Sequence, residues 1–200
     1  MTTTPGLHTL HGVEDEKEAI LEVLPTHCQL DVHDHPGTDR IVQSLEHCSI
    51  AHFACHGLTN YTDPSKSGLV FRKQDGAGSL IQDTMTVQNV SELKLEHARL
   101  AYLSACSTAE NRAVRLKDEV IHVVSRFQVA GFAHVVGCQW PSADAICVEV
   151  AKAFYGTLFG GDGKMEDNDI ASALQKAVST IREKEWDQPL KWAQFVHYGA

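Results

Sequence analysis

Two short apolar runs of this sequence each lead into a side chain that can take part in acyl transfer. His56 ends the run that begins at residue 50, and Cys106 ends the run that begins at residue 100. A thiol with a pKa of about 8.5 is mostly protonated at neutral pH, so a cysteine nucleophile needs a neighbouring imidazole as its base. If both runs are buried strands of one parallel sheet, the two side chains emerge together at its carboxyl edge. We therefore predict His56 as the general base and Cys106 as the nucleophile.

The residues around His56 divide into further site candidates and core candidates. Gly57 lets a substrate approach the backbone closely, and its amide, together with the amide of Cys106, is predicted to bind the oxyanion. Cys55 points to the opposite face of the strand by alternation, so we expect it in the core. His52 lies deeper in the strand, and we expect a hydrogen-bonded, buried histidine there rather than a participant in catalysis.

Hydrophobic periodicity along the chain predicts alternating helices and strands, which is typical of an α/β fold. Helices are expected at 14–24, from Thr38 through 45, from Thr84 or Thr86 through 93, from Asp118 to 130, at 143–159 and at 170–183. Strands are expected at 28–32, 50–56, 100–106 and 133–139, with a small hairpin at 68–81 and an edge strand within 190–198. The polar stretch 107–117 is expected to be a loop.

Composition excludes several functional classes. The 200 residues, 43% hydrophobic and 22% charged, suit one globular domain. The net charge of −9 argues against nucleic acid as a partner. No apolar stretch is long enough to span a bilayer, and residues 1–24 lack the pattern of a signal peptide, so we expect no membrane partner and a cytoplasmic location. The six cysteines are accordingly expected to be free thiols.

Metal and nucleotide cofactors are not expected. His33, Asp34 and His35 form the densest group of potential ligands, but Pro36 and Gly37 follow them and no CxxC pair accompanies them. This segment is therefore interpreted as a polar turn rather than a metal site. No GxGxxG follows a strand, and the glycine-rich stretch 160–163 comes after a helix and lacks the lysine of a P-loop.

The motifs around the two reactive residues resemble those of the CHAT family. These are caspase-like cysteine peptidases, related to caspases and separases and usually found behind tetratricopeptide repeats. The matching segments lie in the family's order at 52–57, 67–70, 103–108, 127–131, 135–140, 154–155 and 192–195. His56 and Cys106 are also 50 positions apart (106 minus 56), the separation described for caspases. The resemblance covers most of the chain and predicts a single CHAT domain at 1–200.

The resemblance implies a caspase-like three-layer sandwich with a mostly parallel central sheet, and a cysteine endopeptidase that uses His56, Cys106 and Gly57 in the roles given above. The loop that contains Trp140 and Asp144 corresponds to the pocket for the residue before the cleaved bond. A carboxylate there implies cleavage after Arg or Lys. Asp144 has an equally weighted alternative as a residue that binds free amides at a helix N-terminus.

Other implied features carry a weaker argument. Asp118 and Glu119 have the same two readings as Asp144, with a weaker claim to the substrate pocket. Trp140 has a core position as its alternative. A polypeptide is the implied substrate, and tetratricopeptide repeats or a regulatory protein are the implied partners.

Two departures from the family keep a second hypothesis open. Family members have an apolar strand before the first helix, placed between the strands predicted at 28–32 and 50–56, and residues 1–12 are too short and polar to supply it. Either the chain is the C-terminal part of a larger protein, or the sheet lacks its first strand and closes differently. The loop at 109–116 also carries charges where the family often has glycines. Both departures favour the alternative, a catalytically inactive scaffold or interaction domain.

Overall fold

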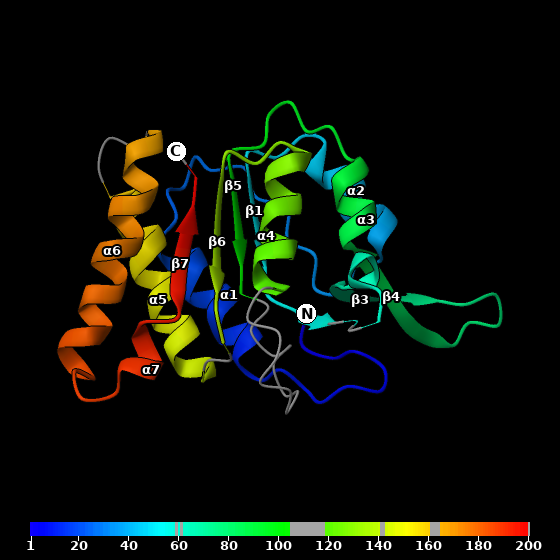
Figure 1. The fold of residues 1–200 in the computed structure, drawn as a ribbon, viewed down its shortest axis with the longest axis horizontal. Coiled ribbons are helices and arrows are strands. Elements are labelled where there is room, and N and C mark those ends of the chain that lie inside the picture. The colour runs from blue at the N-terminus through cyan, green and yellow to red at the C-terminus, as the bar shows by residue number, and fades with distance from the viewer. Residues whose placement is uncertain (59, 61, 105–118, 141–142, 161–164, 200) are drawn as a thin grey trace.

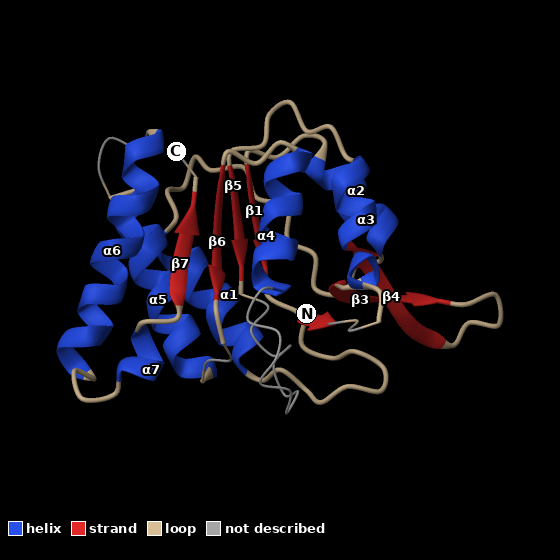
Figure 2. Ribbon diagram, in the orientation of Figure 1, coloured by secondary structure: helices blue, strands red, loops and turns tan. Residues whose placement is uncertain are grey.

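A mostly parallel four-stranded sheet forms the centre of the molecule (Figures 1 and 2). The computed structural model describes residues 1–58, 60, 62–104, 119–140, 143–160 and 165–199. The strands lie in the order β1 (Ile50–Phe53), β5 (Leu100–Leu103), β6 (His134–Cys138) and β7 (Phe195–Tyr198). The first three are parallel, and β7 runs antiparallel to β6 at the edge. The predicted α/β class and mostly parallel sheet are therefore confirmed.

The two strands that precede the candidate residues are direct neighbours. Ile50 lies opposite Leu100, and Phe53 lies opposite Leu103. All four residues of β5 are buried, as expected for an apolar strand covered by helices on both faces. Because the pair is parallel, the carboxyl ends of β1 and β5 lie at the same edge of the sheet.

Helices cover both faces of the central sheet and complete three layers (Figure 2). One face packs against α1 (Gly12–Val23), α5 (Asp144–Leu158) and α6 (Asp167–Lys184), and the other against α2 (Thr38–Leu45), α3 (Val87–Glu92) and α4 (Glu119–Ala130). Alternation along β5 explains the two cores, since Tyr102 joins the first and Ala101 and Leu103 join the second. Within the described ranges, no helix has the length and apolar character needed to cross a bilayer.

A second, antiparallel sheet carries His56 and corrects one prediction. It consists of β2 (His56–Leu58), β3 (Gly68–Gln74) and β4 (Leu80–Thr86), with the short 3-10 helix η1 (Pro64–Lys66) before β3. The hairpin expected at 68–81 is confirmed. The single strand expected at 50–56 is wrong, because the chain leaves β5 after Phe53 and pairs again from His56, which lies opposite Val70.

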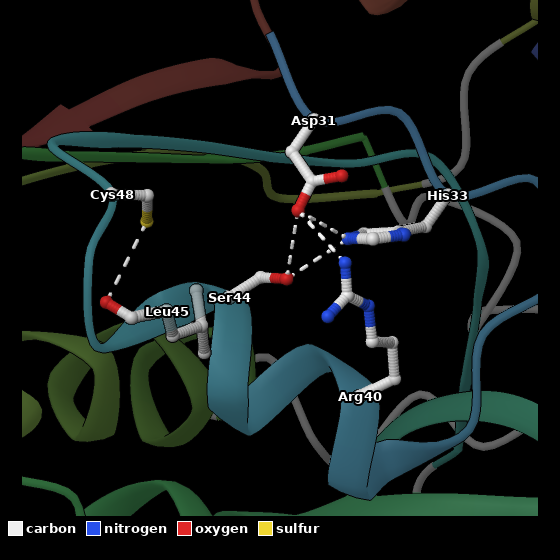
Figure 3. A network of polar contacts seen from close by, with 6 residues as sticks. All are labelled: Asp31, His33, Arg40, Ser44, Leu45 and Cys48. Carbon is white, nitrogen blue, oxygen red and sulfur yellow. Dashed lines mark hydrogen bonds and ion pairs between the residues drawn. The ribbon is translucent and has the colours of Figure 1, made fainter.

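The strand expected at 28–32 is also wrong. The alternating segment pairs with no strand among the residues that the structure describes, and it runs beside α2, to which polar side chains attach it (Figure 3). Asp31 Oδ2 lies 3.1 Å from Ser44 Oγ, 3.3 Å from Arg40 Nη2 and 3.0 Å from His33 Nε2. The residues of opposite parity, Leu30 and Val32, are exposed. The alternation therefore reflects polar side chains that contact α2 and apolar side chains that are exposed to solvent, and it does not indicate a strand.

β1 is consequently an edge strand of the described sheet. In the ranges given above, β1 pairs with β5 only, and no strand lies on its other side. This is the side on which the resemblance implies a further strand.

Most remaining elements lie within a few residues of their predicted positions. Thr86 caps α3, and its hydroxyl accepts a hydrogen bond from the Asn89 amide. Thr38, expected as a cap, is instead the first residue of α2, after the N-cap Gly37. Its amide and hydroxyl donate to Asp83 Oδ2 on β4, so α2 is attached to the second sheet. The segment 190–198 divides into the short α7 (Pro189–Trp192) and the edge strand β7.

Candidate functional site

His56 lies just beyond the carboxyl end of β1, where it opens β2. Its side chain is almost completely buried, with 2% of the residue exposed. The imidazole Nε2–H donates to the backbone carbonyl of His8 at 2.8 Å, and the ring of His8 meets the His56 ring edge-on at 4.7 Å. The candidate base is therefore held by the segment that precedes α1.

The contact with His8 decides which nitrogen of His56 can act as a base. A backbone carbonyl only accepts hydrogen bonds, so the proton of the neutral imidazole resides on Nε2. Nδ1 then has the lone pair and is the nitrogen that accepts a proton. A base whose tautomer and orientation are fixed by a third group is the arrangement that activated nucleophiles use.

The segment that carries His8 is attached to the second sheet and to α1. Thr2 Oγ1 donates to Glu14 Oε1 at 2.8 Å, and Leu10 N donates to the Thr2 carbonyl at 2.9 Å, which closes the segment on itself. On the second sheet, Arg72 donates to Thr3 Oγ1 at 2.8 Å and Gln82 donates to the Pro5 carbonyl at 2.7 Å. These contacts fix the backbone that orients His56.

The other half of the predicted pair, Cys106, lies outside the described residues, as does Asp118. The last described residue of this run is Ser104, directly after β5. Gly57, the predicted oxyanion donor, follows His56 in β2 and lies opposite Leu69. The structure thus places His56 and Gly57 together, and places the end of β5 beside the end of β1.

Cys55 is excluded as a nucleophile although it adjoins His56. It is 1% exposed and packs in the core between the sheet and α4, as predicted. Burial raises the pKa of the Cys55 thiol to about 12, so almost none of it is thiolate at neutral pH. Burial also raises the pKa of Cys48.

Asp144 occupies a helix N-terminus. It is the first residue of α5, and its Oδ2 accepts the amide of Gly12, which begins α1, at 3.0 Å. A Cβ on Gly12 would lie 2.5 Å from Asp144 Cβ, so glycine is required for this approach. The carboxylate therefore has the amide-binding role that was its alternative reading. It remains exposed to solvent.

Trp140 is half-buried beyond the end of β6 and contacts another part of the chain. Its indole N–H donates to the carbonyl of Leu190 in α7 at 2.7 Å. This contact joins the end of β6 to the segment that leads into β7.

Two residues near the site escaped prediction from the sequence. His8 contacts His56 through its backbone carbonyl, which every residue type has, so the residue type at position 8 does not indicate this contact. Glu16 is buried in α1, where it contacts His52 and Ser104 at the edge described above. The signal for Glu16 was its spacing, because it lies three and four positions before Ala19 and Ile20 on the apolar side of α1. His52 itself is hydrogen-bonded, as predicted, at 3.1 Å to the Tyr155 hydroxyl, but it is half-buried rather than buried.

Among the residues that the structure describes, no group of three or more His, Cys, Asp or Glu side chains is arranged to hold a metal ion.

Comparison with known proteins identifies the family. No curated protein matches the sequence. The CHAT domain, a caspase-like peptidase family, matches it over residues 2–200. With that coverage and with a mostly parallel sheet flanked by helices, the chain belongs to the CHAT family.

Proposed function

We propose that this protein is a cysteine endopeptidase in which His56 is the general base and Cys106 the nucleophile. The observation that carries the proposal is the hydrogen bond from His56 Nε2–H to the His8 carbonyl, because it leaves Nδ1 as the proton acceptor. Support also comes from the parallel pairing of β1 with β5, since the stretches leading to His56 and Cys106 start at one edge of the sheet.

The proposed reaction has two chemical steps. Cys106 transfers its proton to His56 Nδ1, and the thiolate attacks the carbonyl carbon of the scissile peptide bond. The amides of Gly57 and Cys106 bind the oxyanion, and the imidazolium of His56 protonates the leaving amine. His56 then takes a proton from water, which attacks the thioester, releases the carboxylic acid product and restores the thiol.

For specificity, we propose cleavage after Arg or Lys. The exposed carboxylate of Asp144 supplies a negative charge beyond the end of β6, at the first residue of α5 and four positions after Trp140. A guanidinium or ammonium group of the substrate would pair with that charge. The amide of Gly12 occupies Oδ2 of the same carboxylate, so the proposed ion pair shares its acceptor with α1.

A peptide-based thiol probe with Arg at the position before its reactive group tests the proposal. We expect the probe to label the native protein at Cys106, and Cys106→Ala to abolish labelling. His56→Ala should lower kcat/KM on the matching fluorogenic peptide by about 10²- to 10⁴-fold, the usual contribution of a general base. Cys48→Ala is the matched control and should be labelled normally.

Two outcomes would contradict the proposal. Equal labelling of the native protein and Cys106→Ala would remove Cys106 as the nucleophile. A native protein that neither reacts with the probe nor turns over any Arg or Lys peptide would favour the alternative, a catalytically inactive scaffold.

A further inference from the structure

A buried carboxylate joins the ends of the two strands that lead to the proposed catalytic residues. Glu16 lies on α1 and is 4% exposed. Its Oε2 accepts a hydrogen bond from the Ser104 hydroxyl at 2.9 Å, and its Oε1 lies 3.2 Å from His52 Nε2. Ser104 directly follows β5, and His52 is in β1. One side chain therefore contacts both strands at their carboxyl ends.

His52 itself has contacts with α5 and β5 besides the one with Glu16. Its Nδ1 lies 3.1 Å from the hydroxyl of Tyr155 on α5, and its ring stacks on Tyr102 of β5 with centroids 4.8 Å apart. The contact with Glu16 has the distance of an ion pair without the direction of a hydrogen bond. Burial raises the pKa of Tyr155 well above its usual value, so its hydroxyl stays protonated as a donor.

Burying the Glu16 carboxylate in such a site costs folding free energy. Burying a charge is unfavourable unless partners compensate for the lost water, and a hydrophobic residue often gives equal stability. A buried charge on α1 that contacts β1 and the residue after β5 restricts the relative positions of these three elements, because any displacement leaves it without its partners. The separation between the ends of β1 and β5 is the quantity that Glu16 restricts here.

We infer that Glu16 is a positioning residue for the acyl-transfer site, acting through Ser104 and His52. This inference rests on the proposed function. Ser104 is two positions before Cys106, and His52 is four positions before His56. Fixing both strand ends sets where the two segments start, and a displacement of about 1 Å at a reacting group can cost about 10²-fold in rate.

Four variants of the full chain test this inference. Glu16→Gln removes the charge, Ser104→Ala removes one contact of Glu16, and Ser104→Thr restores the hydroxyl. Glu18→Gln is the matched control, since Glu18 is an exposed carboxylate on the same helix. We expect kcat to fall by about tenfold or more in Glu16→Gln and Ser104→Ala, with KM within about twofold, and to be retained in Ser104→Thr and Glu18→Gln.

A second readout does not need peptidase activity. The rate of Cys106 alkylation by iodoacetamide at pH 7, measured by peptide mass spectrometry relative to Cys28 in the same sample, reports the environment of the thiol. We expect slower alkylation of Cys106 in Glu16→Gln and Ser104→Ala, and the native rate in Ser104→Thr and Glu18→Gln. Far-ultraviolet circular dichroism checks that each variant is folded. If Glu16→Gln unfolds, the comparison of Ser104→Ala with Ser104→Thr tests the inference in its place.

The outcomes separate this inference from the proposed function. Folded Glu16→Gln and Ser104→Ala proteins with native kcat and native Cys106 alkylation would overturn the role of Glu16 while the peptidase stands. A native protein without peptide turnover, whose Cys106 alkylation still changes in both variants, would overturn the peptidase and leave the positioning role.

Discussion

At the scale of single residues, one substitution separates the observed contact of Asp144 from its proposed role in specificity. Its carboxylate accepts the Gly12 amide, and its charge is proposed to select basic substrates. Asn in this position keeps a carbonyl oxygen for the amide but has no charge. We expect Asp144→Asn to retain the native melting temperature within a few degrees, and to lose at least about tenfold of the preference for Arg over a neutral residue, because a charge-assisted pair contributes more than a neutral one.

The control for this prediction is Asp15→Asn, which removes an exposed carboxylate from the first turn of α1. Its substrate preference should equal that of the native protein. If Asp144→Asn also keeps the native ratio of kcat/KM values for the Arg and neutral peptides, Asp144 only stabilises the start of α1, and the selecting charge lies elsewhere.

Residue types led to the candidate site only where side chains define it. His56 and Gly57 are candidates because of the run that contains them, and Cys55 was correctly assigned to the core. His8 could not be found in this way, because the atom that orients His56 is a carbonyl oxygen that every residue has. The helical spacing of Glu16 was visible in the sequence, but its partners come from β1 and from the end of β5, which only folding brings beside α1.

At the scale of elements, the second sheet carries His56 and depends on a close approach between β3 and β4. Gly68 lies opposite Thr86, and a Cβ at Gly68 would be 2.1 Å from the Met85 carbonyl oxygen. That contact is with backbone, so the strands must separate to accept a side chain. We expect Gly68→Ala to lower the free energy of unfolding by about 1–3 kcal/mol, or somewhat more, in urea denaturation.

Gly76→Ala is the matched control for this prediction, because no atom lies within 4 Å of a Cβ placed there. Its free energy of unfolding should stay within about 0.5 kcal/mol of the native value. Equal stability of the two variants would mean that β3 and β4 accommodate a methyl group without separating, and that His56 does not depend on their spacing.

Element type was predictable wherever one periodicity continued for long enough. The helices α5 and α6 and the strands β5 and β6 appear close to their expected positions, since their apolar residues match the faces that they bury. The change of sheet after Phe53 was not predictable, because the run from 50 to 56 contains no glycine, proline or other turn residue that marks a break, and pairing with β3 decides where β2 begins. Alternation at 28–32 predicted a strand, but this segment pairs with no strand in the described part of the chain.

At the scale of the whole molecule, one polar cluster joins the last strand to the rest of the chain. His134 opens β6, and its Nδ1 lies 3.0 Å from His197 Nε2 on β7. The other nitrogen of His134 lies 3.3 Å from Asp167 on α6, and Arg99, just before β5, donates to Asp167 at 2.6 Å. The cluster lies at the edge of the sheet opposite His56, so it affects global stability more directly than the candidate site.

This cluster predicts that stability decreases as the pH falls below neutrality. Burial, followed by the neighbouring His134, lowers the pKa of His197 below its usual value. The unfolded chain therefore binds more protons at His197 than the folded chain, and the free energy of unfolding falls once the pH passes below the usual histidine pKa of about 6.5. The pKa of Asp167 is lowered mainly by Arg99, so its contribution has the same sign and is lost only in more acidic solution.

Urea denaturation at pH 7.5 and pH 5.5 measures how much of the loss of unfolding free energy is due to protonation of His197. A glutamine side chain keeps a hydrogen-bonding group towards His134 but has no proton to gain in this range, so His197→Gln should lose less stability between the two pH values than the native protein does. His27→Gln is the control, because His27 is exposed, and it should show the native pH dependence. An identical loss in all three proteins would mean that protonation of His197 is not coupled to unfolding, and that the contact between β6 and β7 tolerates a charged imidazole pair.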